Sequence, residues 1–243
     1  MLGTIRNAQG EQLDYTLHAG ARDDAPLVVI GHGVTAHKDR PFLVALAEGL
    51  AGAGIAALRV SFSGNGASQG RFAESTISKE VEDLGAVLDA LPGRTIAYAG
   101  HSMGGAVGVL RASRDARIRC LVSLAAMVHT GAFAQRSCGS RTPGRDLMLD
   151  KPGCVLSQAY LDDLRAIDSV IDQVTRISVP WLFVHGGKDE LIPLADTLDA
   201  FAQARTTKEL VVLDEADHSF EPGFTPAMVQ AVTRWLPAQL AAS

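Results

Sequence analysis

The stretch at residues 95–109, T-I-A-Y-A-G-H-S-M-G-G-A-V-G-V, constrains the fold more than any other part of the chain. Its pattern predicts a short buried strand, a very tight turn at Ser102 and then an apolar helix. Gly100, Gly104 and Gly105 surround the turn, where a Cβ atom would clash as a strand reverses into a helix. The serine would then lie at a helix N-terminus, whose free N–H groups favour a developing negative charge. These features predict a nucleophile elbow with Ser102 as the nucleophile.

A second match to Gly-x-Ser-x-Gly lies at residues 66–70 and is centred on Ser68. It stands in a run of Ser, Gly, Asn and Gln, with no strand before it and no apolar helix after it, which is typical of a loop. Because Ser102 has both flanking elements, the context favours Ser102 over Ser68. The alternative for Ser102 is a serine that caps an ordinary helix.

Apolar, β-branched runs alternate with helical segments along most of the chain. The runs at residues 25–31 and 55–60 are continuously apolar, as expected for strands buried on both faces of a sheet. Further strands are expected at residues 120–125, 181–185 and 209–213, and helices at 42–53, 78–91, 194–204 and 226–240. Residues 2–6 and 12–17 flank a turn signal and predict an opening hairpin. The alternation predicts an α/β fold with a mainly parallel central sheet and helices on both faces.

Residues 127–179 interrupt this alternation. The segment contains no expected strand and one or two expected helices, at residues 157–166 and 169–176. A long insertion of this kind inside a regular α/β pattern is more typical of a functional cap than of a simple connection. We therefore expect a core formed by residues 1–126 and 180–243, with a cap or lid at residues 127–179.

The length, composition and net charge of the chain exclude several classes of protein. A length of 243 residues, of which 47% are hydrophobic, suits one large domain or one domain with an insertion. The net charge of −5 comes without blocks of one sign, so we expect neither a nucleic-acid nor a membrane partner. The N-terminus lacks a signal pattern and no apolar run is long enough to span a membrane. With three cysteines (Cys120, Cys138 and Cys154) and no metal-ligand spacing, a cytoplasmic location is the simpler interpretation, although Cys138 and Cys154 could pair.

A serine hydroxyl becomes a good nucleophile only when a base takes its proton. His218 lies on a loop after a late predicted strand, from which a base can reach back over the sheet edge. Asp189 follows the preceding strand and could fix the histidine tautomer. The order Ser102, Asp189, His218 is the one expected for an elbow of this type. Glu190 and Asp217 are weaker candidates, and we interpret His18, His37, His101, His129 and His185 as structural or surface groups.

Acyl transfer also needs hydrogen-bond donors for the oxyanion. The elbow itself supplies the backbone N–H of Met103. The second donor should come from the loop after residues 27–30, where Gly33 allows the N–H of Val34 to point inward. The alternative for this loop is a plain turn at a strand end. The reaction requires no metal and no organic cofactor.

The stretch H-G-V-T-A-H-K at residues 32–38 resembles the oxyanion loop of bacterial esterases, including cinnamoyl and feruloyl esterases, and of related serine-aminopeptidase-like hydrolases. From about residue 26 to the C-terminus, apart from the cap, the sequence is similar to the α/β-hydrolases. The run R-V-S-F-S-G-N-G-A-S at residues 59–68 resembles a loop in which many relatives have Asp-x-Arg-Gly-x-Gly-x-Ser. Ser61 stands for that Asp and Ser63 for that Arg, a departure expected to alter the pocket floor. The resemblance implies the same triad and the same two oxyanion donors.

Three functions fit these residues. The first is a serine hydrolase that cleaves carboxylic esters of small to medium substrates through an acyl-enzyme on Ser102. The second is a peptidase or thioesterase with the same triad, and the third is a non-catalytic protein of the same fold that binds a ligand or partner. Motif and fold specify the substrate poorly, and they do not indicate the oligomeric state.

The cap is expected to set substrate choice. Its basic residues either meet an acidic or polar substrate or form a solvated face; they are Arg136, Arg141, Arg145 and Lys151, against Asp146 and Asp150. Its apolar positions have helical spacing and are expected to dock the cap rather than bind ligand; they are Leu156, Tyr160, Leu161, Leu164 and Ile167.

Overall fold

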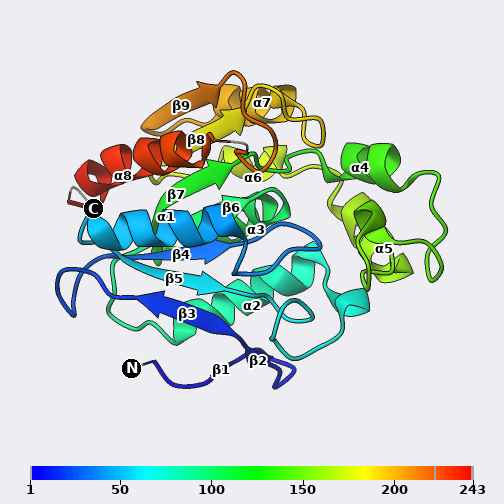
Figure 1. Ribbon diagram of the computed structural model, residues 1–243, viewed down its shortest axis with the longest axis horizontal. Coiled ribbons are helices and arrows are strands. Elements are labelled where there is room, and N and C mark those ends of the chain that lie inside the picture. The colour runs from blue at the N-terminus through cyan, green and yellow to red at the C-terminus, as the bar shows by residue number, and fades with distance from the viewer. Residues whose placement is uncertain (1, 222, 242–243) are drawn as a thin grey trace.

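A seven-stranded sheet of order β3-β5-β4-β6-β7-β8-β9 forms the centre of the computed structural model, which describes residues 2–221 and 223–241 (Figure 1). Six strands are parallel, and β3 runs antiparallel to β5 at one edge. The strands of this sheet are β3 (Tyr15–His18), β4 (Leu27–Gly31), β5 (Ala56–Val60), β6 (Ile96–His101), β7 (Ile118–Leu124), β8 (Trp181–Gly186) and β9 (Lys208–Leu213). The predicted α/β fold is confirmed.

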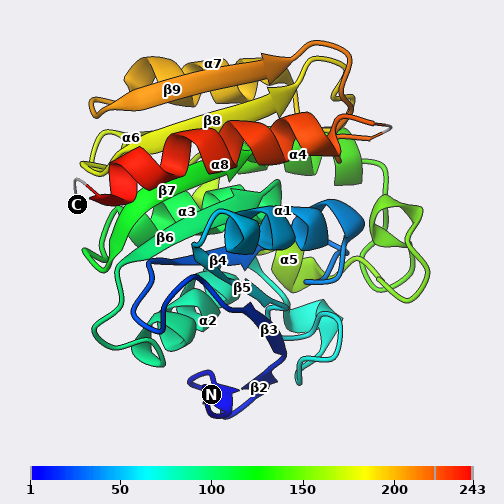
Figure 2. The ribbon, with the colours of Figure 1, turned by 60° about the vertical axis from the view of Figure 1, so that its left-hand side comes forward.

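Helices cover both faces of the sheet, because its inner strands are apolar on both sides. Every residue of β4, β5, β6 and β8 is buried. One hydrophobic cluster lies under α1 (Pro41–Gly52) and α8 (Thr225–Ala241), which run across the same face in Figure 2. A second cluster packs the other face, against α2 (Ile77–Asp89), α3 (Met103–Ala112) and α7 (Leu194–Gln203).

The opening hairpin is smaller than predicted. Only β1 (Ile5–Arg6) and β2 (Gln12–Leu13) pair with each other, and the chain then leaves the hairpin to form β3 in the main sheet. The expected continuous strand at residues 12–17 is therefore wrong. At the break, the Asp14 N–H donates to Ser68 Oγ instead of to a neighbouring strand.

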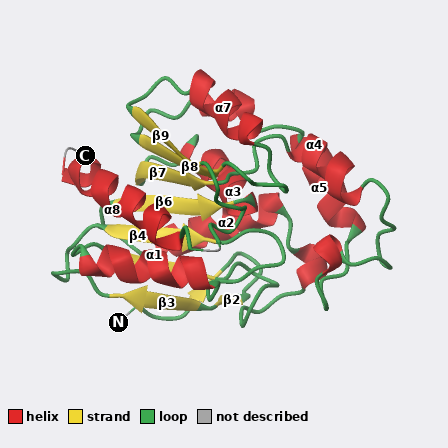
Figure 3. Ribbon diagram, turned by 45° about the horizontal axis from the view of Figure 1, so that its top comes forward, coloured by secondary structure: helices red, strands yellow, loops and turns green. Residues whose placement is uncertain are grey.

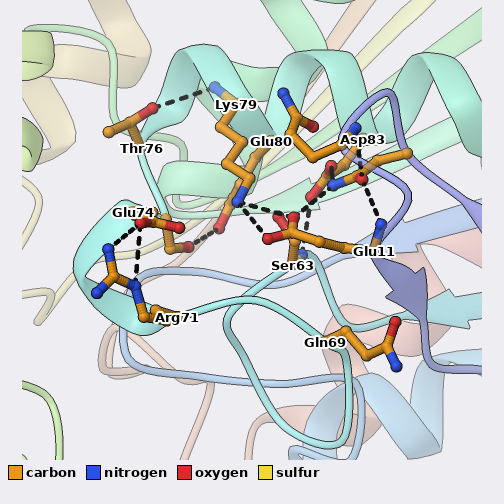
Figure 4. A network of polar contacts seen from close by, with 12 residues as sticks. Glu11, Ser63, Gln69, Arg71, Glu74, Thr76, Lys79, Glu80 and Asp83 are labelled. Carbon is orange, nitrogen blue, oxygen red and sulfur yellow. Dashed lines mark hydrogen bonds and ion pairs between the residues drawn. The ribbon is translucent and has the colours of Figure 1, made fainter.

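A buried polar network ties this hairpin to α2 and to the loop after β5 (Figure 4). The Asp83 carboxylate accepts hydrogen bonds from Asn7 Nδ2 at 2.8 Å and from the Ser63 N–H at 2.7 Å. Lys79 Nζ lies 2.8 Å from Glu11 Oε2. Burial and the nearby charge of Asp83 raise the pKa of Glu80 well above its ordinary value. Asp83 on α2 thus connects the hairpin and the loop after β5 through one carboxylate.

Within residues 127–179, α4 and α5 lie beyond the carboxyl ends of the parallel strands in Figures 1 and 3, whereas the chain after α6 returns to the amino end of β8. The expected helix at 157–166 is present as α5, whereas the one at 169–176 is reduced to a single turn, α6. The helical elements are α4 (Thr130–Phe133), a π-helical turn (Ala134–Cys138), a 3₁₀ turn (Met148–Asp150), α5 (Gln158–Ile167) and α6 (Ile171–Val174). The predicted docking positions Leu156, Tyr160, Leu161 and Leu164 are buried in the same hydrophobic cluster as α2 and α3, and Ile167 packs against it. Their docking role is confirmed.

None of the helices within the described ranges combines the length and the apolar character that a membrane span needs.

All three cysteines are free thiols, so Cys138 and Cys154 do not pair. A short 3₁₀ turn, Phe72–Glu74, precedes α2.

The elbow glycines permit a close approach of two backbones. A Cβ atom added to Gly104, in the first turn of α3, would lie 2.5 Å from the carbonyl oxygen of His32, at the start of the loop after β4. Real Cβ atoms do not approach a backbone oxygen so closely. The absence of a side chain at Gly104 therefore allows the elbow helix and this loop to lie against each other.

We expect Gly104→Ala to lower the free energy of unfolding by at least about 2 kcal/mol, because two backbone segments must separate to admit the methyl group. Gly52→Ala is the matched control, since a Cβ atom there meets nothing within 4 Å at the end of α1. Urea unfolding followed by circular dichroism measures both. Equal stability of the two variants would contradict the steric explanation.

Candidate active site

The elbow holds Ser102 in a strained backbone conformation. Its φ of 54° and ψ of −118° lie in a region that a side-chain-bearing residue rarely adopts. Backbone hydrogen bonds hold the turn: the Ser102 N–H donates to Leu124 O at 2.9 Å, and its carbonyl accepts from the Met127 N–H at 2.9 Å. Ser102 thus lies between the end of β6 and the start of α3, as predicted.

The structure brings Asp189 and His218 together. His218 Nδ1 lies 2.7 Å from Asp189 Oδ2. Asp189 is almost fully buried, and its other oxygen, Oδ1, accepts from the N–H groups of Leu191 and Ile192 at 2.9 Å each. Because a carboxylate can only accept, Nδ1 of His218 carries a proton, and in the neutral ring Nε2 has a free lone pair. The side chain is thus oriented as a base.

Neither of the two weaker acidic candidates forms a hydrogen bond or ion pair with the histidine ring among the described residues. Asp217 Oδ1 accepts from the N–H groups of Ser219 and Glu221, which shapes the loop that carries His218. Glu190 is exposed to solvent. Asp189 is the acid that contacts the ring.

Ser102 and His218 line the same pocket, which has a volume of about 190 Å³. No hydrogen bond joins Ser102 Oγ to His218 in the part of the chain that the structure describes; such bonds are often long before a substrate binds. The rest of the lining comes from the loop after β4 and from His101, Leu191 and Ser219, with Leu149 and Lys151 of the inserted segment. Larger hollows exist, such as one of about 440 Å³ between β9 and α8, but Ser102, Asp189 and His218 do not line it.

Two backbone donors are available at this pocket. Among the described residues, the N–H groups of Val34 and Met103 meet no acceptor. Val34 lines the pocket, and Met103 is the first residue of α3, directly after Ser102. Unpaired N–H groups beside a serine can stabilise a negatively charged oxygen.

Arg59 on β5 binds the loop that carries Val34. Arg59 Nη1 donates to Lys38 O at 2.6 Å and to Asp39 Oδ1 at 2.7 Å. Burial alone would raise the pKa of Asp39, but hydrogen bonds from Arg59 and Lys38 outweigh it and lower the pKa. This ion-pair network fixes the far end of the loop.

Ser61 does not form the pocket floor. Its hydroxyl accepts from the Lys38 N–H at 3.1 Å, and its carbonyl accepts from Ser68 Oγ at 2.6 Å. Neither Ser61 nor Ser63 lines the pocket. The expected effect on the pocket floor is therefore wrong: both serines are buried, and Ser61 connects two loops. Ser68, the second Gly-x-Ser-x-Gly match, is a loop residue, as predicted.

His32 is a buried neutral histidine under the same loop. Its Nε2 accepts from the Phe62 N–H at 3.0 Å, so the proton is on Nδ1, which donates to Gly33 O at 2.8 Å. Burial lowers its pKa to about 4. The bond from Phe62 needs the neutral ring, because protonation of Nε2 would abolish it, whereas Nδ1 could donate to Gly33 O in either state.

His101 positions the loop of His218, a contact that the sequence analysis missed. Its Nε2–H donates to the His218 carbonyl at 2.8 Å, and the two rings lie 4.6 Å apart. Its Nδ1 is buried and meets no hydrogen-bond partner in the described part of the chain. Burial, with the charges of His218 and Arg40, holds the pKa of His101 well below its usual range. The sequence offers one signal for this role, the place of His101 directly before Ser102.

Two basic residues that line the pocket were not among the site residues predicted from the sequence. Arg40 belongs to the loop after β4, and Lys151 follows the 3₁₀ turn of the inserted segment. In the sequence Lys151 belongs to a basic stretch in which no periodicity indicates which side chain faces the site.

The sequence matches the family model described as serine aminopeptidase, S33, over residues 23–141 and 147–221. Among solved structures, it is similar to Est1E from Butyrivibrio proteoclasticus with ferulic acid bound, at 26% identity and a TM-score of 0.86, covering 98% of this chain and 99% of that one. It is also similar to the esterase domain of a Rhodothermus marinus protein, at 23% identity and a TM-score of 0.75, covering 98% of both chains. Mouse alpha/beta hydrolase domain-containing protein 10 has 18% identity and a TM-score of 0.79, covering 98% of this chain and 99% of that one. No curated protein sequence matches this chain.

We expect the buried neutral His32 to make stability depend on pH. Its folded-state pKa of about 4 lies below the unfolded value of about 6.5, so the unfolded chain binds the proton first. The contribution of His32 to the free energy of unfolding is therefore fully present above pH ~6.5 and decreases as the pH falls towards 4. At pH 5 it has decreased by about 2 kcal/mol.

Urea unfolding of the wild type and of His32→Gln at pH 7.5 and pH 5 measures this contribution. The variant should lose about 2 kcal/mol less than the wild type between the two pH values. Some loss should persist in the variant, because His101 acts in the same direction. An equal loss in both proteins would show that His32 is not the responsible group.

Proposed function

The chain belongs to the serine aminopeptidase (S33) family of α/β hydrolases, and we propose that it cleaves carboxylic esters of small to medium size through an acyl-enzyme on Ser102. One observation carries the proposal: a single pocket is lined by a strained serine and by a histidine whose Nδ1 faces a buried carboxylate. The unpaired N–H groups of Val34 and Met103 complete this set. Nucleophile, base, orienting acid and oxyanion donors are the parts that acyl transfer needs.

In the proposed acylation, His218 Nε2 takes the proton of Ser102 Oγ, and Oγ forms a bond to the ester carbonyl carbon. The carbonyl oxygen becomes an oxyanion that accepts from the N–H groups of Val34 and Met103. Losing one such donor typically costs about 3 kcal/mol of transition-state stabilisation. The intermediate collapses as the carbon–oxygen bond to the alcohol breaks, and His218 gives its proton to the leaving alcohol.

Deacylation repeats these steps with water. His218 takes a proton from water, the resulting hydroxide adds to the acyl carbon, and Ser102 leaves with the proton held by His218. The product is a carboxylic acid. Throughout, Asp189 keeps Nδ1 of His218 protonated and stabilises the imidazolium that forms in each half-reaction.

The comparisons support an ester substrate. Est1E, which is 26% identical over nearly the whole chain, binds ferulic acid, and a carboxylic acid is what an ester hydrolase releases. The family description favours amide bonds as a second candidate. However, no Asp or Glu is found among the described residues that line the pocket, so no carboxylate is placed to hold the ammonium group of an aminopeptidase substrate.

We expect a fluorophosphonate probe to label the wild-type protein at Ser102, located by peptide mass. Ser102→Ala and His218→Ala should both abolish labelling, because one removes the nucleophile and the other its base. Ser68→Ala is the matched control, since Ser68 shares the motif but lies in a loop, and it should retain labelling. Absence of labelling in folded wild-type protein would overturn the mechanism and favour a non-catalytic binding protein.

A panel of aryl esters, thioesters and aminoacyl amides then identifies the bond that is cleaved. We expect kcat/KM to be highest for the esters and to fall by a factor of about 10⁴ or more in Ser102→Ala. A higher kcat/KM for the amides would replace the esterase by a peptidase with the same residues.

A further inference from the structure

The pocket beside Ser102 is cationic although the whole chain is acidic. Its lining contains Arg40 and Lys151, and no acidic side chain belongs to it in the described part of the chain. The chain as a whole has a net charge of −5. Two basic residues from separate segments therefore converge on one small cavity, against the overall charge.

The acids next to these two residues in the sequence are already bound elsewhere. Asp39, beside Arg40, accepts from Arg59 Nη1 at 2.7 Å and from Lys38 Nζ at 3.0 Å. Asp150, beside Lys151, pairs with both terminal nitrogens of Arg141, at 2.8 and 2.9 Å. Because Asp39 and Asp150 are bound to other basic residues, they do not neutralise the charges of Arg40 and Lys151.

Arg40 has only one polar contact of its side chain among the described residues, a 3.5 Å approach of Nη2 to Ser219 Oγ. Its charge is close enough to the elbow to lower the pKa of His101. Arg40 is half-buried, whereas Lys151 is exposed at the mouth, and neither has a carboxylate partner within the described ranges. A guanidinium with a nearly empty hydrogen-bonding fork is suited to a planar oxyanion.

The inserted segment has other basic residues, but they differ from Lys151. Arg141 pairs with Asp150, and Arg145 pairs with Asp146. Arg136 is exposed and does not line the pocket. Of the basic stretch noted in the sequence, Lys151 alone lines the described pocket.

We propose that the substrate is an ester that carries a free carboxylate, which Arg40 and Lys151 bind while the scissile carbonyl lies at Ser102. The inference rests on the proposed ester hydrolysis and adds the substrate class. The two positive charges attract the anion and orient it, and the N–H groups of Val34 and Met103 remain free for the oxyanion. A pocket of about 190 Å³ favours short substrates, such as half-esters of dicarboxylic acids or acyl esters of hydroxy acids.

The test compares matched probes with and without the negative charge. With the carboxylate on the alcohol side, 4-acetoxybenzoate is compared with methyl 4-acetoxybenzoate. With the carboxylate on the acyl side, 4-nitrophenyl hydrogen adipate is compared with 4-nitrophenyl methyl adipate. The quantity measured is the ratio of kcat/KM for the charged probe to that for its neutral partner, after subtraction of spontaneous hydrolysis.

We expect this ratio to fall about fivefold or more in Lys151→Met and in Arg40→Met for at least one probe pair, and to fall less in Arg40→Lys, which keeps the charge but not the planar fork. Arg136→Met is the matched control, because it removes an exposed charge of the same segment outside the pocket, and it should leave the ratio unchanged. Because exposed charges are screened, 1 M NaCl should also lower the wild-type ratio.

Binding to Ser102→Ala gives a readout that does not depend on turnover. In calorimetry with Ser102→Ala, 4-acetoxybenzoate or 4-nitrophenyl hydrogen adipate should bind more tightly than its neutral partner. In the double variant that also carries Lys151→Met, this difference in affinity should disappear. If neutral esters are cleaved but both ratios and both affinities are insensitive to Lys151 and Arg40, the substrate class is wrong and the proposed function stands. If Ser102 is neither labelled nor active, the proposed function fails, and equal affinities for charged and neutral probes overturn the carboxylate site as well.

Discussion

The backbone of Ser102 is the constraint on which the site depends. A non-glycine residue with φ of 54° and ψ of −118° is unfavourable, so the rest of the fold must hold it there. Hydrogen bonds to Leu124 and Met127 fix the turn, and the bare backbone of Gly104 allows the loop after β4 to approach it. One strained residue therefore determines where the side chain projects and which N–H groups surround it.

The other functional groups are connected to this turn by few contacts. His101, directly before Ser102, donates to the main chain of His218, and the ring of His218 is held by Asp189. Asp189 is in turn fixed by the N–H groups of Leu191 and Ile192. The ends of β6 and β8 and the loop after β9 are thereby joined into one polar cluster at the carboxyl edge of the sheet.

Local pattern predicted the fold, and it singled out the three residues that the structure brings to one edge of the sheet, because glycine placement at Ser102 and strand-to-loop order at Asp189 and His218 are encoded within short stretches. The boundaries of α1 and α8 differ from their predictions by only one residue at each end. The split between β2 and β3 was missed, since it depends on a hydrogen bond from Asp14 to the distant Ser68. The bond between His101 and His218 joins residues 117 positions apart, and the convergence of Arg40 and Lys151 is likewise tertiary. No spacing rule in the sequence indicates such contacts.

Burial within residues 127–179 also limits how the pocket can open. Tyr160 and Leu164 on α5 belong to the same hydrophobic cluster as α2 and α3, and Tyr160 contacts Met103 Sδ through its hydroxyl. A hinged swing of the whole segment would expose that cluster to water, at a large cost in free energy. Leu149 and Lys151 instead lie in a stretch closed by an isolated bridge between Leu147 and Val155. The contribution of this segment to the pocket lining thus comes from a small closed loop, which can change its shape without exposing the cluster that holds α5 in place.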